Sequence, residues 1–133
     1  MASFRPRSRW SRDRRDRGAV DVSIQMLFGS MAVIMVMLLI FEAVAFWHAR
    51  NIFDEAAAEG ARVAAAYDGT CEEGIAVARE MVQRHAGSWA ERVLVTCTDG
   101  DIVRVVVAGR TPGVLGERLG MRARAVETAP KER

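Results

Sequence analysis

The sequence predicts an α+β fold with one long N-terminal helix, a second amphipathic helix and a small antiparallel sheet of two or three strands. Three observations indicate this class. A run of 20 residues without a charge, Val22 to Phe41, precedes two stretches in which apolar residues recur at helical spacing. On both sides of Asp99-Gly100, apolar residues then recur at every second position, a pattern that is typical of a β-hairpin. The length of 133 residues excludes a multidomain enzyme.

Residues 1–18 form a basic tail. Its first 17 residues contain seven arginines against two aspartates, whereas residues 48–133 are close to neutral. By the positive-inside rule, this asymmetry keeps the N-terminus in the cytoplasm and places the C-terminal part outside. We expect no nucleic-acid partner, because the tail has no folded domain around it and precedes an apolar span; anionic lipid explains its charge more simply.

Residues 19–47 predict a transmembrane helix. Twenty uncharged residues at about 1.5 Å each span roughly the 30 Å hydrocarbon thickness of a bilayer. Trp47 stands at the outer end, where amphipathic rings favour the headgroup layer. The alternative is a signal peptide cleaved after Ala45, since Ala43-Val44-Ala45 has the small-x-small form. Against it, the apolar run is longer than the usual ~7–15 residues of a signal peptide.

Glu42 is a carboxylate near the outer end of this span. A charge inside the bilayer costs a few kcal/mol at the centre and less near an end. Two interpretations stay open. Glu42 pairs with a cation on a neighbouring helix of an assembly, or it marks the end of the membrane.

Residues 48–66 predict a helical stalk that continues from the span, because they are rich in alanine and lack proline. Apolar residues recur on it at spacings of three and four, so this stripe must be covered by something. Gly60 on the stripe permits the close approach of a partner. The stripe consists of Ile52, Phe53, Ala56, Ala57, Gly60 and Val63.

Residues 67–128 predict a small extracytoplasmic α+β domain. Turn residues at 67–70 end the stalk, and a helix over 72–85 able to pack on the stalk follows, with Ile75, Ala78, Met81 and Val82 inward. The remaining segments, in chain order, are strands over 92–97 and 102–107, a loop over 109–120, a third strand over 121–128 and a loosely held polar tail over 129–133.

Both cysteines, Cys71 and Cys97, fall in the part of the chain expected outside the cytoplasm, where thiols are oxidised. We hypothesise that they form an internal disulfide. It would close a loop of about 26 residues, which is worth about 3 kcal/mol in the chain-entropy model. Two free thiols or intermolecular links are the alternatives, and the even count favours the internal bridge.

No motif for catalysis or cofactor binding is found, and we expect a non-enzymatic protein without metal or cofactor. His48 and His85 are the only histidines, and no Cys/His cluster has ligand spacing. Ser88, Cys71 and His85 lack the context of a catalytic triad or nucleophile elbow. A membrane-anchored extracytoplasmic binding or sensor module remains an alternative function.

Several motifs, in their order along the chain, carry a resemblance to a known family. They are Arg17-Gly18-Ala19-Val20, then Glu42 near the end of one apolar helix, Trp47-His48-Ala49-Arg50-Asn51, Ala56-Ala57-Ala58-Glu59-Gly60-Ala61-Arg62, and Gly109-Arg110-Thr111-Pro112 after a Val-rich hairpin. Together they resemble the TadE-like family, the minor pseudopilins of tight-adherence (Flp-type) pilus assembly, in its actinobacterial form.

The resemblance implies a pilin-like fold and a single-pass membrane subunit of a pilus assembly or secretion apparatus, with a role in cell adhesion or secretion. Its partners would be other pseudopilins or pilus-assembly membrane proteins and the lipid bilayer. The residues expected to form the assembly helix are Ser23, Glu42, Ile52, Phe53, Ala56, Gly60 and Val63.

The resemblance also implies a prepilin peptidase as a partner. In the family this peptidase cuts after a glycine, here Gly18, so that the mature chain would begin at Ala19. The family has glutamate at the fifth mature position, whereas this chain has Ser23 there. This departure favours a chain that stays a full-length anchor rather than one that enters a fibre.

Overall fold

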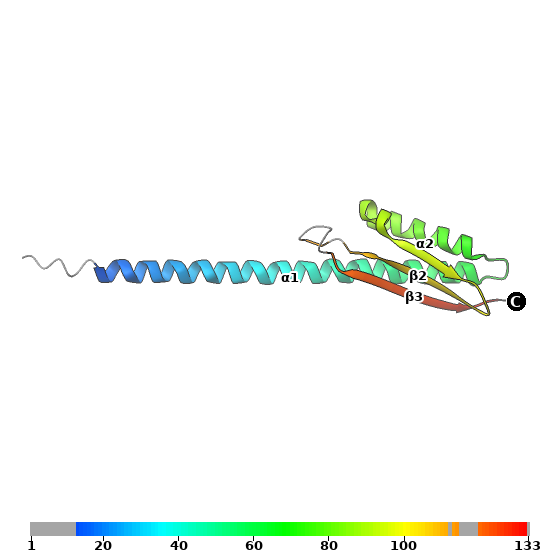
Figure 1. Cartoon of the computed structure of the whole chain (residues 1–133), viewed down its shortest axis with the longest axis horizontal. Helices are drawn as coiled ribbons and strands as arrows, with labels where there is room; N and C mark the ends of the chain where they lie inside the picture. The colour runs from blue at the N-terminus through cyan, green and yellow to red at the C-terminus, as the bar shows by residue number, and fades with distance from the viewer. Residues whose placement is uncertain (1–12, 112, 115–119, 133) are drawn as a thin grey trace, which may run out of the picture. The chain divides into compact units, whose positions relative to one another are not determined.

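The computed structural model describes residues 13–111, 113–114 and 120–132 and confirms the predicted α+β class (Figure 1). The elements, in chain order, are α1 (Asp13–Ala65), α2 (Cys71–Ala86), the 3₁₀ helix η2 (Gly87–Arg92), β1 (Leu94–Thr98), β2 (Ile102–Arg110) and β3 (Arg122–Pro130). The chain divides into two compact units, residues 1–39 and residues 40–133.

The described part of the first unit, residues 13–39, is helical throughout. The helix begins at Asp13 and therefore includes the end of the basic tail that we predict over 1–18. The rest of that tail, 1–12, lies outside the described residues. No proline interrupts the segment, and each backbone N–H can therefore bond along the helix, as an apolar environment requires.

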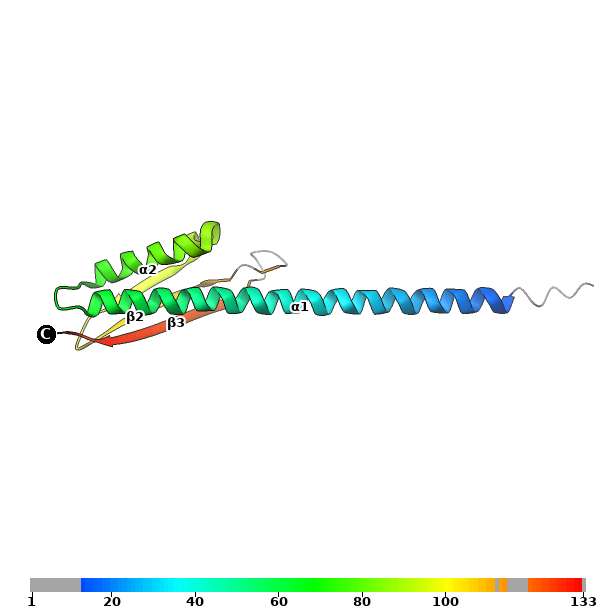
Figure 2. The same cartoon turned by 180° about the vertical axis from the view of Figure 1, so that it is seen from behind.

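The second unit contains the C-terminal part of α1, from Ile40, together with α2 and the sheet. Both views show α2 and the strands running along this part of α1 (Figures 1 and 2). The predicted membrane segment, 19–47, therefore has its last residues in this unit, where Phe46 packs against the core. The largest fully buried side chains of the core are Phe53, Val82, Val103, Val105, Val107 and Thr111.

The two helices cross at a pair of glycines. A Cβ atom added to Gly60 would lie 2.8 Å from the carbonyl oxygen of Gly74, and one added to Gly74 would lie 2.6 Å from the carbonyl oxygen of Gly60. Ala64 and Ala78, one turn further along each helix, are also in contact with this crossing. The backbones can approach this closely only because both positions lack a side chain.

Local signals set the ends of α2. Thr70 and Glu73 form a capping box, in which Glu73 N–H donates to Thr70 Oγ1 at 3.2 Å and Thr70 N–H donates to Glu73 Oε2 at 3.1 Å. Gly87, with φ of +60°, ends the helix. The buried face differs from the prediction in part. Ala78 and Val82 are buried, but Ile75 and Met81 are only half-buried, and the other buried residues are Gly74 and Ala86.

The sheet is antiparallel with the order β1-β2-β3. Alternate residues of β2 point to the core, as the period of two predicts. The strand is longer than expected, because Gly109 and Arg110 belong to it rather than to the predicted loop over 109–120. Gly109 fits there since a Cβ at this position would lie only 3.2 Å from Phe53 Cζ. The helix η2 was not predicted; its Trp89 ring lies 5.7 Å from the ring of Phe53.

The C-terminal segment corrects the prediction of a loose polar tail over 129–133. Ala129 and Pro130 belong to β3. The next residue, Lys131, donates from Nζ to the carbonyl oxygen of Ala64 at 2.8 Å and to that of Gly69 at 2.5 Å. The backbone N–H of Glu132 donates to the carbonyl oxygen of Ala65 at 2.8 Å. Lys131 and Glu132 thus satisfy the carbonyl groups of Ala64 and Ala65, which the end of α1 leaves without partners, and Lys131 places a positive charge at the negative pole of this helix.

We expect Gly74→Val to lower the free energy of unfolding by about 1–3 kcal/mol, since the added side chain overpacks the helix crossing. The full-length chain in detergent micelles, unfolded by denaturant and followed by circular dichroism, provides the measurement. Gly100→Val is the matched control, because a Cβ at Gly100 meets nothing closer than 3.7 Å. Equal stability of the two variants would contradict a tight crossing.

Candidate functional site

The helical segment from Val20 to Leu39 is left uncovered by the rest of the chain. Its most apolar 18-residue window has a mean hydropathy of 2.4, and none of that window is buried. By its length and composition this helix can cross a membrane. A signal sequence near the N-terminus has the same length and composition. Exposed apolar side chains of this extent in a soluble setting would be an association surface or an aggregation hazard.

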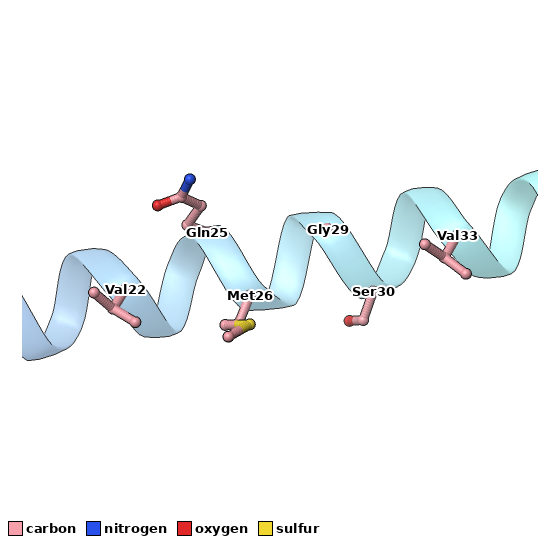
Figure 3. Close-up of a pocket in the computed structure, with 6 residues that line it drawn as sticks. All are labelled: Val22, Gln25, Met26, Gly29, Ser30 and Val33. Atoms are coloured by element: carbon pink, nitrogen blue, oxygen red, sulfur yellow. The ribbon is translucent and has the colours of Figure 1, made fainter.

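One face of this segment carries small and polar residues. Figure 3 shows the six residues that line a groove on it, Val22, Gln25, Met26, Gly29, Ser30 and Val33. Ser30 Oγ donates to the carbonyl oxygen of Leu27 at 2.9 Å, so its hydroxyl has a partner within the helix. A Cβ at Gly29 would meet nothing within 4 Å. The face therefore has space for the backbone of a second helix.

The residues proposed for processing lie on the same helix. Gly18 and Ala19 are within α1, five and six residues after its first residue, Asp13. Ser23 lines a different groove from the one in Figure 3, together with Val20, Ile24 and Leu27. The structure thus places Ser23 and the Gln25–Gly29–Ser30 face on separate grooves of one helix.

Glu42 has a partner within its own chain. Its Oε2 accepts a hydrogen bond of 2.8 Å from the backbone N–H of Val114, which follows β2. Glu42 is half-buried, and the contact joins positions 72 residues apart. Neither interpretation drawn from the sequence included this bond, because nothing in the local pattern connects the two positions. Glu42 thus joins Val114 to α1.

The stalk stripe is not an exposed assembly surface, which corrects the expectation for Ile52, Phe53, Ala56 and Gly60. Phe53 and Ala56 have 0% of their surface exposed, and all four residues are buried. The chain's own α2 and sheet cover them, and of the predicted stripe only Val63 is half-buried. The stripe does need cover, as its spacing indicates, but the cover comes from within the chain.

Cys71 and Cys97 lie at disulfide-bonding distance, as hypothesised from the sequence, with their Cα atoms 5.5 Å apart. Cys71 is the first residue of α2, and Cys97 is near the end of β1. The pair therefore joins the helix that crosses α1 to the sheet that completes the core.

Glu59 and Arg62 form an ion pair on the surface of α1. Arg62 donates to both carboxylate oxygens, at 2.9 and 2.5 Å, and this hydrogen bonding lowers the pKa of Glu59 and raises the pKa of Arg62. The stabilisation is present above the ordinary glutamate pKa and is lost as the pH falls through the lowered value. Because both groups are exposed to water, the pair contributes little to stability.

No protein-family model, no curated protein and no solved structure matches the chain. Among the described residues, no group of three or more His, Cys, Asp or Glu side chains is placed to hold a metal ion. Two features of the described residues bear on function: an exposed apolar helix that carries Gly29, Ser30 and Gln25 on one face, and a folded unit that covers its own stalk.

We expect the full-length protein to migrate faster on a non-reducing gel than after thiol treatment, because the Cys71–Cys97 bridge keeps the denatured chain compact. Replacing both cysteines by serine should abolish the difference and lower the free energy of unfolding by about 3 kcal/mol, as for a loop of this length. A thiol-sensitive band at the size of a dimer would instead show an intermolecular link.

Proposed function

We propose that this protein is a non-enzymatic, single-pass membrane subunit of a tight-adherence type pilus assembly or secretion apparatus. Its N-terminus lies in the cytoplasm and its folded unit outside. The observation that carries the proposal is the contrast along α1: residues 20–39 are exposed apart from half-buried Leu38, whereas the stripe after them is buried apart from half-buried Val63. A helix of this composition is stable in lipid, where its side chains need no other cover.

The resemblance to the TadE-like family supports the choice of apparatus. In this proposal, however, the surface that binds other subunits is the membrane segment and not the stalk stripe. Helices associate in lipid through small residues that allow close backbone approach and through polar side chains that bond across the interface. Gly29 supplies the first feature, and Gln25 and Ser30 supply the second. Other membrane subunits of the apparatus are the partners of this face.

The folded unit has a separate role in this proposal. It presents a rigid outer surface, because its stalk, second helix and sheet are joined by the Gly60–Gly74 crossing and by the cysteine pair. Its core residues are unavailable to partners. Contacts with other outer domains would therefore use exposed residues of α1, of α2 and of the outer face of the sheet.

The membrane topology gives a first test. A protease-cleavable tag placed after residue 133 should be removed on intact cells, whereas the same tag before residue 1 should be protected until the cells are lysed, because the arginine-rich tail stays inside. The reverse pattern would contradict the proposed orientation. Release of the tagged protein into the medium would identify the apolar segment as a cleaved signal sequence.

The partner proteins give a second test. In Gly29→Leu, the new side chain fills the groove, and we expect recovery of other membrane subunits with the tagged protein from native membranes to fall at least about fivefold, the effect of losing roughly 1 kcal/mol. Met31→Leu is the control, since Met31 lies roughly 200° around the helix axis from Gly29. Equal recovery with both variants would remove this face from the interface.

A further inference from the structure

The sheet has a long, regular edge along β3. The strand order β1-β2-β3 makes β3 one of the two edge strands. It has nine residues, and its register with β2 is continuous from Arg122 to Pro130, so no bulge interrupts it. The other edge strand, β1, has only five residues and is joined at Cys97 to Cys71 of α2. Of the two edges, β3 therefore offers the longer uninterrupted backbone.

Two backbone hydrogen bonds show which groups of β3 face this edge. Thr111 N–H donates to the carbonyl oxygen of Met121 at 2.9 Å, and Lys131 N–H donates to that of Asp101 at 3.0 Å. Both pairs continue the register of β2 and β3, in which hydrogen-bonded pairs alternate with pairs that are not bonded. Odd-numbered residues of β3 therefore bond to β2, and even-numbered residues direct their N–H and C=O groups away from it. The even-numbered residues are Arg122, Arg124, Val126, Thr128 and Pro130.

Pro130 agrees with this assignment, because proline has no N–H and occurs in a strand where no bond of the sheet depends on it, as at an edge. The other even-numbered residues, Arg122, Arg124, Val126 and Thr128, are exposed. Within the described part of the chain, no hydrogen bond joins their edge-facing backbone groups to another element. The edge thus presents donors and acceptors at every second residue, and this spacing matches the backbone of an extended strand.

The side chains along the edge favour an acidic strand. Side chains on the same face of neighbouring strands lie side by side, where opposite charges attract and like charges repel. On its outer face, β3 presents Arg122 and Arg124, followed by the uncharged Val126 and Thr128. A strand with carboxylates beside the two arginines therefore fits best. A second copy of β3 would bring two further arginines and only one glutamate, and so the same excess of positive charge.

We propose that β3 binds an extended segment of a partner protein, with acidic residues at alternate positions and apolar residues between them, as an added strand of the sheet. Backbone hydrogen bonds along the edge supply affinity, and carboxylate–arginine pairs supply specificity. The apolar residues of the partner lie on the same face as Ala123 and Ala125, which belong to the core. The inference goes beyond the proposed function, because residues 40–133 carry it whether or not residues 20–39 cross a membrane.

The test uses the full-length chain in neutral detergent micelles and a short, fluorophore-labelled peptide of alternating glutamate and valine. Peptide anisotropy reports binding, and nuclear magnetic resonance reports amide hydrogen exchange. In the free protein we expect fast exchange at Arg124, Val126 and Thr128, whose amides face the edge. Ala125 and Glu127 bond to β2 and should exchange slowly. Bound peptide should slow exchange at the three edge amides at least about tenfold, and a lysine–valine peptide should bind at least about tenfold more weakly.

Two variants separate the backbone contribution from that of the charges. Val126→Pro removes one edge-facing N–H but none of the bonds to β2, and should weaken binding of the glutamate–valine peptide at least about fivefold. Arg124→Glu should weaken this binding about tenfold and strengthen binding of the lysine–valine peptide. Arg104→Glu is the matched control, because it makes the same change of charge on β2, one strand further from the edge. It should change binding by less than about twofold.

Four outcomes would overturn the inference. Slow exchange at the edge amides of the free, dilute protein would show that the chain covers its own edge. Protection of these amides that rises with protein concentration, without peptide, would assign the edge to a second copy. Equal binding by the wild type and Val126→Pro, with the rest of the sheet still protected in the variant, would mean that the peptide does not bind as a strand. Equal affinity for the two peptides would exclude an acidic partner.

Discussion

The close contact between Gly60 and Gly74 is the constraint on which the arrangement of residues 40–133 depends. With side chains absent at both positions, the backbones of α1 and α2 approach within the reach of each other's carbonyl oxygens. The position of α2 then sets the position of the sheet, because Cys71 at the start of α2 is paired with Cys97 of β1. The buried valines of β2 complete the core against Phe53 and Val82. A small core of this size gains from each such constraint, since it buries little apolar surface per residue.

Because α2 and the sheet pack only on the C-terminal part of α1, the two parts of this helix have different surroundings. From Ile52 onward, the apolar stripe is buried inside the folded unit apart from half-buried Val63. The segment before Leu39 exposes its apolar side chains. In the proposed function, the hydrocarbon of the bilayer solvates the segment before Leu39, and the chain itself covers the stripe after Ile52. Association is then left to the small and polar groups around Gly29, which lipid does not solvate well.

The contacts at the two ends of the sheet are of different kinds. At the end near Ala65, Lys131 and Glu132 bond to terminal carbonyl groups of α1 and fix the chain's last residues. At the other end, Glu42 accepts a hydrogen bond from the backbone N–H of Val114. The first end is closed by hydrogen bonds within the chain. At the second, the contact with α1 is a hydrogen bond from a backbone N–H to a side-chain carboxylate.

Local periodicity and residue chemistry in the sequence were sufficient for the α+β class, the long apolar helix, the second helix, the hairpin around Gly100 and the pairing of the two cysteines. The helices and the hairpin depend on neighbours a few residues apart, so the pattern contains them. The cysteine pair spans 26 residues, and its prediction came from the even count and the expected oxidising compartment. The pattern also showed that the stalk stripe needs cover and that the second helix can pack on the stalk, but it did not show that the sheet completes the cover. The cover by the sheet, the partner of Glu42 and the contacts of Lys131 with the end of α1 depend on strand register and on how the helices cross. Only the tertiary structure decides these, because they join residues that lie far apart along the chain.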